Sequence, residues 1–122
     1  MADRVFLFDG DCAFCSSSAR WLTRRVPTDV QIVAWQHTDL DLLGVDVREV
    51  EVAVVLAGPA GSTSGAAAIA ELLLASDGRT WRLAGRALGL PLVRPVARAV
   101  YRWVAANRHR LPGGTPECAL PR

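Results

Sequence analysis

Short apolar runs alternate with segments of helical periodicity along the first half of the chain. Three runs rich in valine, leucine and phenylalanine predict buried strands: Arg4–Phe8, Val30–Trp35 and Val52–Leu56. Between the first two runs, Cys12–Arg25 has helical character and is followed by Pro27, which ends it. A strand, a helix and a second strand in this order predict a βαβ unit with parallel strands.

The second half predicts one return strand and several helices. Ser62–Ser64 follows a glycine-rich turn and can pair back onto the third strand. The expected helices are Thr38–Leu43, capped by Thr38 or Asp39; Gly65–Ala75, capped by Ser64; Trp81–Leu88; and Pro95–Asn107. No linker is long enough to separate two domains. We therefore expect residues 1–122 to form one α/β domain, a βαβ unit followed by a βαβ-like or ββα half and a helical C-terminal extension.

Charge is divided unevenly along the chain. Residues 1–78 hold 5 arginines and 11 acidic residues, a net charge of −6, whereas residues 79–122 hold 9 arginines and one acid, a net charge of +8. This split predicts a basic C-terminal segment lying partly against a more acidic body. The stripe of Arg94, Arg98 and Arg102 is expected to be a solvated helix face. No aromatic-interleaved motif accompanies it, so nucleic acid is not an expected partner.

Cysteine usage and the absence of long apolar stretches bear on location. The chain holds only three cysteines, Cys12, Cys15 and Cys118, which is not the framework of a secreted disulfide-rich protein. The N-terminus lacks the pattern of a signal peptide, and no stretch reaches the ~18 apolar residues of a membrane span. We expect a cytoplasmic protein with no membrane span, in which the close cysteine pair serves redox or metal chemistry.

Two carboxylates follow the first strand. Asp9 and Asp11 have the Asp-x-Asp spacing of phosphatases in which the first aspartate is a nucleophile. Such a site also needs a metal held by a later acidic pair and usually a lysine to balance the phosphate charge. The chain has no lysine, and no acidic pair follows a later apolar strand. The phosphatase interpretation is therefore disfavoured.

Two thiols begin the first expected helix. Cys12 lies where unpaired backbone N–H groups and the helix dipole favour a thiolate, and Cys15 lies one turn further in. We expect Cys12 to be exposed and to attack a substrate disulfide, and Cys15 to be more buried and to resolve the mixed disulfide. Asp9 is either a proton acceptor for Cys15 or a helix-entry residue that binds local N–H groups. Such chemistry requires no cofactor.

A metal site is the alternative use of the same thiols. Cys12, Cys15, His109 and Cys118 could form a Cys₃His zinc set, although the spacing of the last two is not typical of zinc sites. Cys118 could also be an inert tail cysteine or a third redox thiol near the active site, which is the interpretation we favour. A metal-binding or interaction module built on these cysteines therefore stays open as a second hypothesis.

The run Asp9-Gly10-Asp11-Cys12-Ala13-Phe14-Cys15 resembles the signature of the DCC family (DUF393) of thiol-disulfide oxidoreductases. The segment "STSGAA" at residues 62–67 resembles the middle of that family, with Gly65 where an acidic residue is usual. The segment "YRWVAANRHRLPGGTPEC" at residues 101–118 resembles its C-terminal pattern. The resemblance implies a thioredoxin-like fold, a redox pair at Cys12 and Cys15, Asp9 as the motif acid, and thiol-disulfide exchange.

Further residues are candidate neighbours of the dithiol: Asp11, Phe14, Asn107, Arg108 and Cys118. The implied partners are a protein or small-molecule disulfide or dithiol and a cellular thiol reductant. One feature departs from thioredoxin-like proteins, which usually carry a cis-proline before the strand that faces the dithiol. Here Arg48–Glu51 precedes the third expected strand and contains no proline, which leaves metal binding open.

Overall fold

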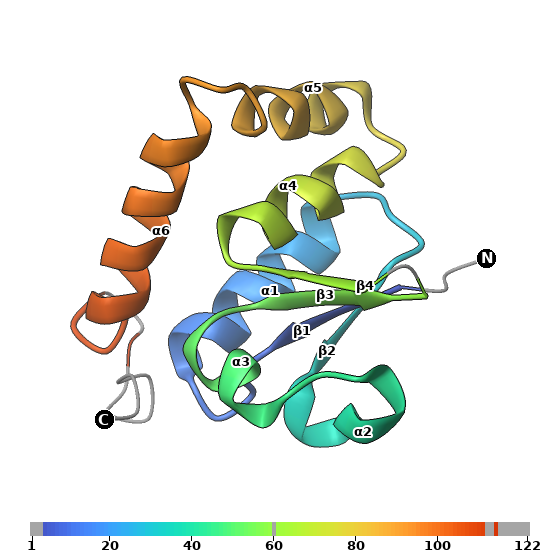
Figure 1. The fold of residues 1–122 in the computed structure, drawn as a ribbon, viewed down its shortest axis with the longest axis vertical. Helices are drawn as coiled ribbons and strands as arrows, with labels where there is room; N and C mark the ends of the chain where they lie inside the picture. The colour runs from blue at the N-terminus through green and yellow to red at the C-terminus, as the bar shows by residue number, and fades with distance from the viewer. Residues whose placement is uncertain (1–3, 60, 112–113, 115–122) are drawn as a thin grey trace.

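A four-stranded sheet lies at the centre of the computed structural model, which describes residues 4–59, 61–111 and 114 (Figure 1). Its strands are β1 (Val5–Phe8), β2 (Gln31–Ala34), β3 (Val55–Gly58) and β4 (Gly61–Ser64). The order across the sheet is β2-β1-β3-β4. Strand β1 runs parallel to β2 and antiparallel to β3, and β3 runs antiparallel to β4. The parallel pair encloses the expected βαβ unit.

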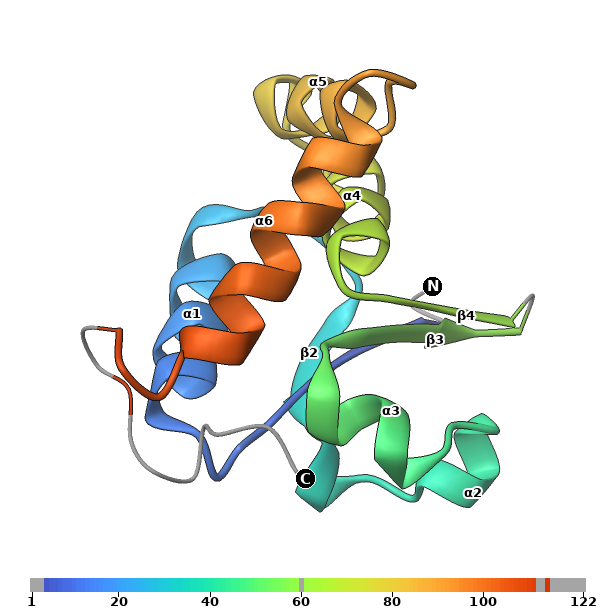
Figure 2. The same cartoon turned by 60° about the vertical axis from the view of Figure 1, so that its left-hand side comes forward.

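Helices cover both faces of the sheet (Figures 1 and 2). On one side lie α1 (Ala13–Arg25), α4 (Ala66–Leu74), α5 (Arg79–Leu88) and α6 (Arg94–Asn107). On the other lie the short helices α2 (Leu40–Leu43) and α3 (Val47–Val52), which follow a 3₁₀ turn at Trp35–His37. Among the described residues, no helix combines the length and apolar character that crossing a membrane requires.

The core has two halves because successive side chains of a strand point to opposite faces. In β1, Phe6 joins a cluster with Leu56 and Leu72 on the side of α1 and α4. Leu7 joins a second cluster with Val50 and Val55 on the side of α3. Phe6, Leu7 and the residues around them are buried almost completely. Strand β1 is thus anchored from both sides, which fixes the position of the loop that carries the cysteines.

The α/β class and the thioredoxin-like arrangement are confirmed, with the Cys-x-x-Cys motif at the start of α1 and helices α5 and α6 as a C-terminal extension. The second half has the ββα form, since β3, β4 and α4 follow one another. The cap of the short helix α2 is Asp39, whose carboxylate accepts the N–H groups of Asp41 and Leu42.

Two local predictions were wrong. Residues 47–52 form helix α3, and the third strand begins at Val55 instead of Val52. Asp46 caps this helix by accepting the N–H of Arg48, and Val50 is buried against the sheet. Ser64 does not cap α4. The residue at that position is Gly65, whose φ of +64° is a conformation that other residues rarely adopt.

Helix α6 is joined to the body through a hydroxyl that reaches the sheet. The Tyr101 hydroxyl accepts a hydrogen bond from the N–H of Val54 at 2.9 Å, just before β3. A Cβ added to Gly65 would lie 3.4 Å from the Tyr101 ring, an ordinary contact, so the positive φ and not the space around it favours glycine there. In both views α6 runs alongside α1 and α4 (Figures 1 and 2). Its C-terminal end therefore lies near the start of α1.

Candidate active site

Cys12 is the N-cap of α1, and its sulfur turns back over the first helical turn. The N–H of Cys15 donates to Cys12 Sγ at 3.4 Å, and both side chains pack against Phe8 and Phe14. Cys12 is 0% exposed and Cys15 is 8% exposed. The expectation of an exposed Cys12 was wrong, because its side chain packs with Cys15 in a buried cluster. Cys15 is buried, as expected.

The two cysteines are not bonded to each other. Cys15 is a free thiol. Cys12 is disulfide-bonded and does not titrate. The structure therefore holds a buried thiol one helical turn from a sulfur that is already in a disulfide.

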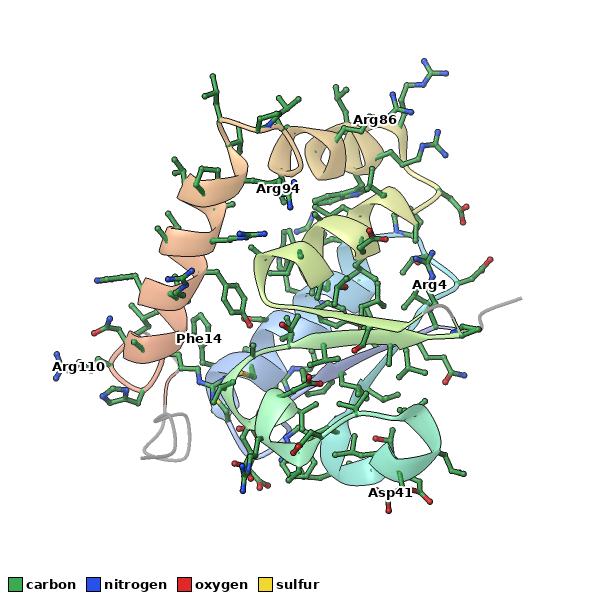
Figure 3. All side chains as sticks on the ribbon, in the orientation of Figure 1. Arg4, Phe14, Asp41, Arg86, Arg94 and Arg110 are labelled. Atoms are coloured by element: carbon green, nitrogen blue, oxygen red, sulfur yellow. The ribbon has the colours of Figure 1, made fainter. Side chains whose placement is uncertain are left out.

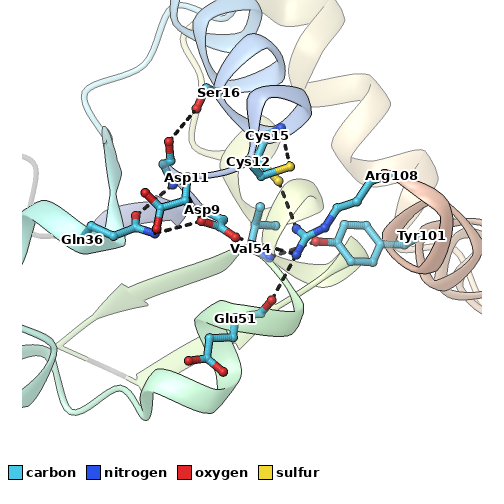
Figure 4. Close-up of polar contacts among 11 residues, drawn as sticks. Asp9, Asp11, Cys12, Cys15, Ser16, Gln36, Glu51, Val54, Tyr101 and Arg108 are labelled. Carbon is cyan, nitrogen blue, oxygen red and sulfur yellow. Dashed lines mark hydrogen bonds and ion pairs between the residues drawn. The ribbon is translucent and has the colours of Figure 1, made fainter. Parts of the chain in front are cut away.

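Arg108 lies against Cys15 and links three parts of the chain (Figure 4). Its guanidinium donates to Cys15 Sγ at 3.0 Å and to the carbonyl oxygen of Glu51 at 3.1 Å. The same guanidinium forms an ion pair with Asp9, with 3.9 Å between its nitrogen and Asp9 Oδ2. Arg108 is only 4% exposed. The end of α6 thus places a buried positive charge on the thiol, and the segment before β3 accepts a hydrogen bond from the same guanidinium.

Burial decides the protonation of Cys15. Removal from water raises the pKa of the Cys15 thiol above its ordinary value of 9.0. The Arg108 guanidinium opposes this shift, by its charge and by its hydrogen bond, whereas the charge of Asp9 adds to it. Because the net shift is upward, Cys15 carries its proton at neutral pH. A base is then needed before this sulfur can attack.

Asp9 lies between the thiol and a polar cluster at the ends of β1 and β2. Its Oδ1 accepts the N–H of Asp11 at 3.0 Å and the Nε2 of Gln36 at 2.8 Å. Gln36 also donates to Asp11 Oδ2 at 3.3 Å and accepts the N–H of Gly10 at 2.8 Å. The local N–H contact predicted for Asp9 is present. Its other oxygen, Oδ2, lies 3.9 Å from the Arg108 guanidinium.

A side chain at position 10 of the motif would clash with neighbouring residues, which explains the glycine there. A Cβ at Gly10 would lie 2.7 Å from the Cβ of Ala34, closer than side chains approach. It would also lie 3.0 Å from Gln36 Oε1, the atom that accepts the Gly10 N–H. Glycine therefore lets the loop after β1 pack directly on the end of β2, and this packing brings Gln36 to the two aspartates.

The sequence comparisons identify the family. The model of the DCC1-like thiol-disulfide oxidoreductase family matches residues 6–114. The chain belongs to this family. No curated protein and no solved structure matches it.

The DCC1-like match includes Cys12, Cys15 and Arg108 but ends before Cys118. Cys118 lies outside the described residues. Asn107, another candidate neighbour, does not reach the dithiol: its amide donates to the carbonyl oxygen of Trp103 at 2.8 Å, within α6. Asp11 is exposed at the surface; its N–H donates to Asp9, and its carboxylate accepts a hydrogen bond from Gln36.

Two side chains of this DCC1-like site were not singled out from the sequence. Gln36 could have been found, because the ends of two parallel neighbouring strands lie at the same edge of a sheet and Gln36 follows β2. Tyr101 opens the C-terminal segment that resembles the family, but its contact with Val54 depends on where α6 lies. Burial raises the pKa of the Tyr101 hydroxyl above its ordinary value of 10.0.

The side chains around the DCC1-like dithiol bear on the metal hypothesis. Within residues 4–59, 61–111 and 114, no group of three or more histidine, cysteine, aspartate or glutamate residues is placed to hold a metal ion. The nearest cation to Cys15 is the Arg108 guanidinium, 3.0 Å from its sulfur. That positive charge would repel a metal ion at this sulfur.

Proposed function

We propose that this DCC1-like protein catalyses thiol-disulfide exchange, with Cys12 as the attacking sulfur and Cys15 as the resolving sulfur. The observation that carries the proposal is the buried guanidinium of Arg108, hydrogen-bonded to the free Cys15 thiol at 3.0 Å. A fixed cation beside a thiol favours the thiolate and disfavours a metal ion. It therefore supports redox chemistry over the metal-binding alternative.

The proposed exchange has two displacements. Before them, a cellular dithiol reduces the disulfide that holds Cys12 and is itself oxidised to a disulfide. Cys12, now a thiolate, attacks one sulfur of the substrate disulfide, which forms a Cys12–substrate disulfide and releases the other substrate sulfur as a thiolate. Cys15 then gives up its proton and attacks Cys12 Sγ, which forms the Cys12–Cys15 disulfide and releases the remaining substrate thiolate. A cellular thiol reductant restores both thiols. The substrate is a disulfide of a protein or a small molecule.

Asp9 is the proposed proton acceptor for Cys15. The thiol is protonated at neutral pH because burial raises its pKa, and the negative charge of Asp9 is close enough to add to that shift. Of the two carboxylate oxygens, Oδ1 is occupied by Gln36 and the N–H of Asp11, whereas Oδ2 lies on the Arg108 side. Proton transfer to Asp9 would leave the Cys15 thiolate beside Arg108, which stabilises it.

Burial of Cys12 sets a condition on the first step. A sulfur with 0% exposure cannot meet a protein disulfide until the residues around it move. Among the described residues, Cys12 forms a buried cluster with Cys15 against which Phe8 and Phe14 pack, and Phe14 lies on the side of α1 that faces α6 (Figure 3). The proposal therefore includes a local opening at the start of α1 before substrate attack.

Serine variants of the two cysteines test the proposal with glutathione disulfide as substrate, after full reduction of the protein. Cys12→Ser is expected to lose exchange activity. Cys15→Ser combined with Cys118→Ser, which leaves Cys12 as the one thiol, is expected to accumulate one glutathione per chain on Cys12, read by mass. Ser17→Ala, at an exposed position on the same helical turn, is the matched control and is expected to behave as the wild type. Full activity in Cys12→Ser would overturn the assignment of the nucleophile.

A further inference from the structure

A cavity of about 560 Å³ lies beside the dithiol, between α6 and the body of the protein. Its volume is within the range of small-molecule sites, roughly 300–1,000 Å³. The walls come from β1, α1, α4 and α6. Almost all lining side chains are apolar; the polar ones are Cys15, Ser18, Tyr101 and Arg108. We propose that this cavity binds an elongated, uncharged apolar molecule, a site distinct from the disulfide chemistry itself.

The cavity is long because it follows helix α6. Lining residues on this helix recur from Val93 to Arg108, among them Ala97 and Tyr101. These fifteen steps at 1.5 Å each correspond to a length of roughly 22 Å. At the end formed by the start of α1 lie Cys15 and Arg108, and at the other lie Leu88 and Val93. A linear hydrocarbon chain or a chain of linked apolar units fits this shape.

A polypeptide segment is poorly matched to the same walls. The backbone N–H and C=O groups of an extended strand would lose water to walls with few polar atoms, which is costly. The chemistry of the walls therefore favours a ligand without buried polar groups.

Charge balance at the thiol end decides whether the ligand carries a charge. Among the described residues that line the cavity, Arg108 alone is charged. Asp9 Oδ2 lies 3.9 Å from its guanidinium, and the carbonyl oxygen of Glu51 accepts a hydrogen bond from the same group. Since Cys15 is protonated at neutral pH, the guanidinium and the carboxylate already offset each other. A carboxylate on the ligand would add an uncompensated negative charge in a buried place.

Paired alanine variants test the cavity. Ala97 lines it, whereas Ala99, two residues away on α6, is exposed and does not. On α4, Ala66 lines it and its neighbour Ala67 is exposed. The probe is Nile red, a neutral dye whose fluorescence rises in apolar surroundings, titrated into the wild-type protein and into Ala97→Phe, Ala99→Phe, Ala66→Leu and Ala67→Leu.

The wild type is expected to bind the dye saturably, at one site per chain. Ala97→Phe and Ala66→Leu are expected to weaken binding at least about tenfold by filling the cavity, whereas the two controls stay within about twofold of the wild type. The two variants change different walls of the cavity, so if one of them does not fold, the other still tests the proposal. Absence of saturable binding, or equal effects of the lining and control variants, would overturn the proposal.

A matched pair of competitors tests the charge argument. 1-Dodecanol and dodecanoate have the same chain length and differ in head-group charge. Dodecanol is expected to displace the dye at the lower concentration and to slow alkylation of Cys15, whose sulfur lines the cavity. If dodecanoate competes as well as dodecanol or better, the uncharged ligand class is wrong. Loss of exchange activity in the cysteine variants does not affect this dye binding, so the two proposals fail separately.

Discussion

The guanidinium of Arg108 sets the chemistry of Cys15 at the scale of single residues. It lowers the pKa of a thiol that burial raises. In Arg108→Gln, burial and Asp9 remain while the opposing charge is lost, so the pKa of Cys15 is expected to rise further. The resolving step should then reach half its maximal rate at a higher pH. Alkylation of Cys15 against pH, read by mass, measures this shift directly.

The control for Arg108→Gln is Arg110→Gln, which removes an exposed arginine two residues further along the chain. It should leave the pH profile unchanged. Arg108→Gln also removes a donor from the carbonyl oxygen of Glu51, which is expected to lower the free energy of unfolding by about 1–3 kcal/mol. A lower stability without any change in the pH profile would show that Arg108 is structural only.

Asp9 has two opposite effects on Cys15, and Asp9→Asn separates them. Removing the negative charge lowers the pKa of the thiol, which by itself would speed its attack. Removing the proton acceptor slows the attack, typically by about 10²–10⁴-fold for a positioned base. We expect the second effect to dominate in the release of glutathione from Cys12. An unchanged or faster release would identify Asp9 as an electrostatic and structural residue, and Asp11→Asn serves as the exposed control.

The position of the two cysteines could be predicted from the sequence, but the exposure of Cys12 and the contacts of Arg108 could not. The motif was sufficient to place Cys12 and Cys15 at the start of a helix, because the strand, the turn and Pro27 bound that helix on both sides. Exposure of Cys12 could not be deduced, since it depends on the rotation of an N-cap side chain toward the N–H of Cys15. Arg108 was a candidate neighbour, but its hydrogen bond to Cys15 joins residues 93 positions apart, and a contact over that separation depends on the whole fold.

At the scale of elements, prediction from the sequence was wrong where the local pattern is ambiguous. Residues 47–52 have valines spaced by three and then by two positions, which fits neither a helix nor a strand over the whole segment. They form α3 because Asp46 caps the first turn and Val50 is buried against Leu7 and Val55. Six residues are too few for the spacing of apolar positions to distinguish a helix from a strand. The cap at Asp46 and the burial of Val50 therefore determine the structure of this segment.

The contact between α4 and α5 depends on one glycine. A Cβ at Gly85 would lie 2.9 Å from both the carbonyl oxygen of Ala70 and the N–H nitrogen of Leu74. Both are backbone atoms and cannot rotate away. Alanine favours a helix over glycine by about 1 kcal/mol, but overpacking costs about 1–3 kcal/mol. Gly85→Ala is therefore expected to lower the free energy of unfolding, measured by urea denaturation.

Gly89→Ala is the matched control for Gly85→Ala. Gly89 ends the same helix with a φ of −87°, and the nearest atom to an added Cβ is 3.5 Å away, an ordinary contact. This variant is expected to be neutral or slightly stabilising. Equal losses in both variants would mean that α4 and α5 adjust to the added methyl group and that Gly85 does not fix their approach.

At the scale of the whole molecule, α6 closes the site from outside the sheet. Tyr101 fixes its middle to the segment before β3, and Arg108 fixes its end to the thiol and to Glu51. From Val93 to Arg108 the helix does not pack closely against α1, α4 and β1, and the space left between them is the apolar cavity. The amphipathic pattern of residues 95–107 predicts a helix with one apolar face, but it does not show how closely that face packs. The cavity is therefore a property of the assembled fold.

Buried acids make the stability of the whole molecule depend on alkaline pH. The folded-state pKa values of Cys15 and Tyr101 are both raised above their ordinary values of 9.0 and 10.0. Above pH 9 the unfolded chain releases these protons first, so the folded state binds more protons than the unfolded state. The resulting stability is present in full below pH 9 and is lost as the pH rises through the folded-state pKa values, by up to about 1.4 kcal/mol per pH unit for each group.

The composition of the chain makes this loss measurable, because it has no lysine and Tyr101 is its one tyrosine. Among side chains, the groups that titrate between pH 9 and 11 are thus cysteine thiols and Tyr101, since arginine stays charged throughout. The free energy of unfolding, measured by urea denaturation, should fall as the pH rises from 7 to 11. The slope of this fall against pH should be smaller in Cys15→Ala, and smaller again in Cys15→Ala combined with Tyr101→Phe. Both variants lower stability at every pH, but only the slope reports the titrating groups. A slope that persists in the double variant would place the alkaline loss of stability elsewhere in the chain.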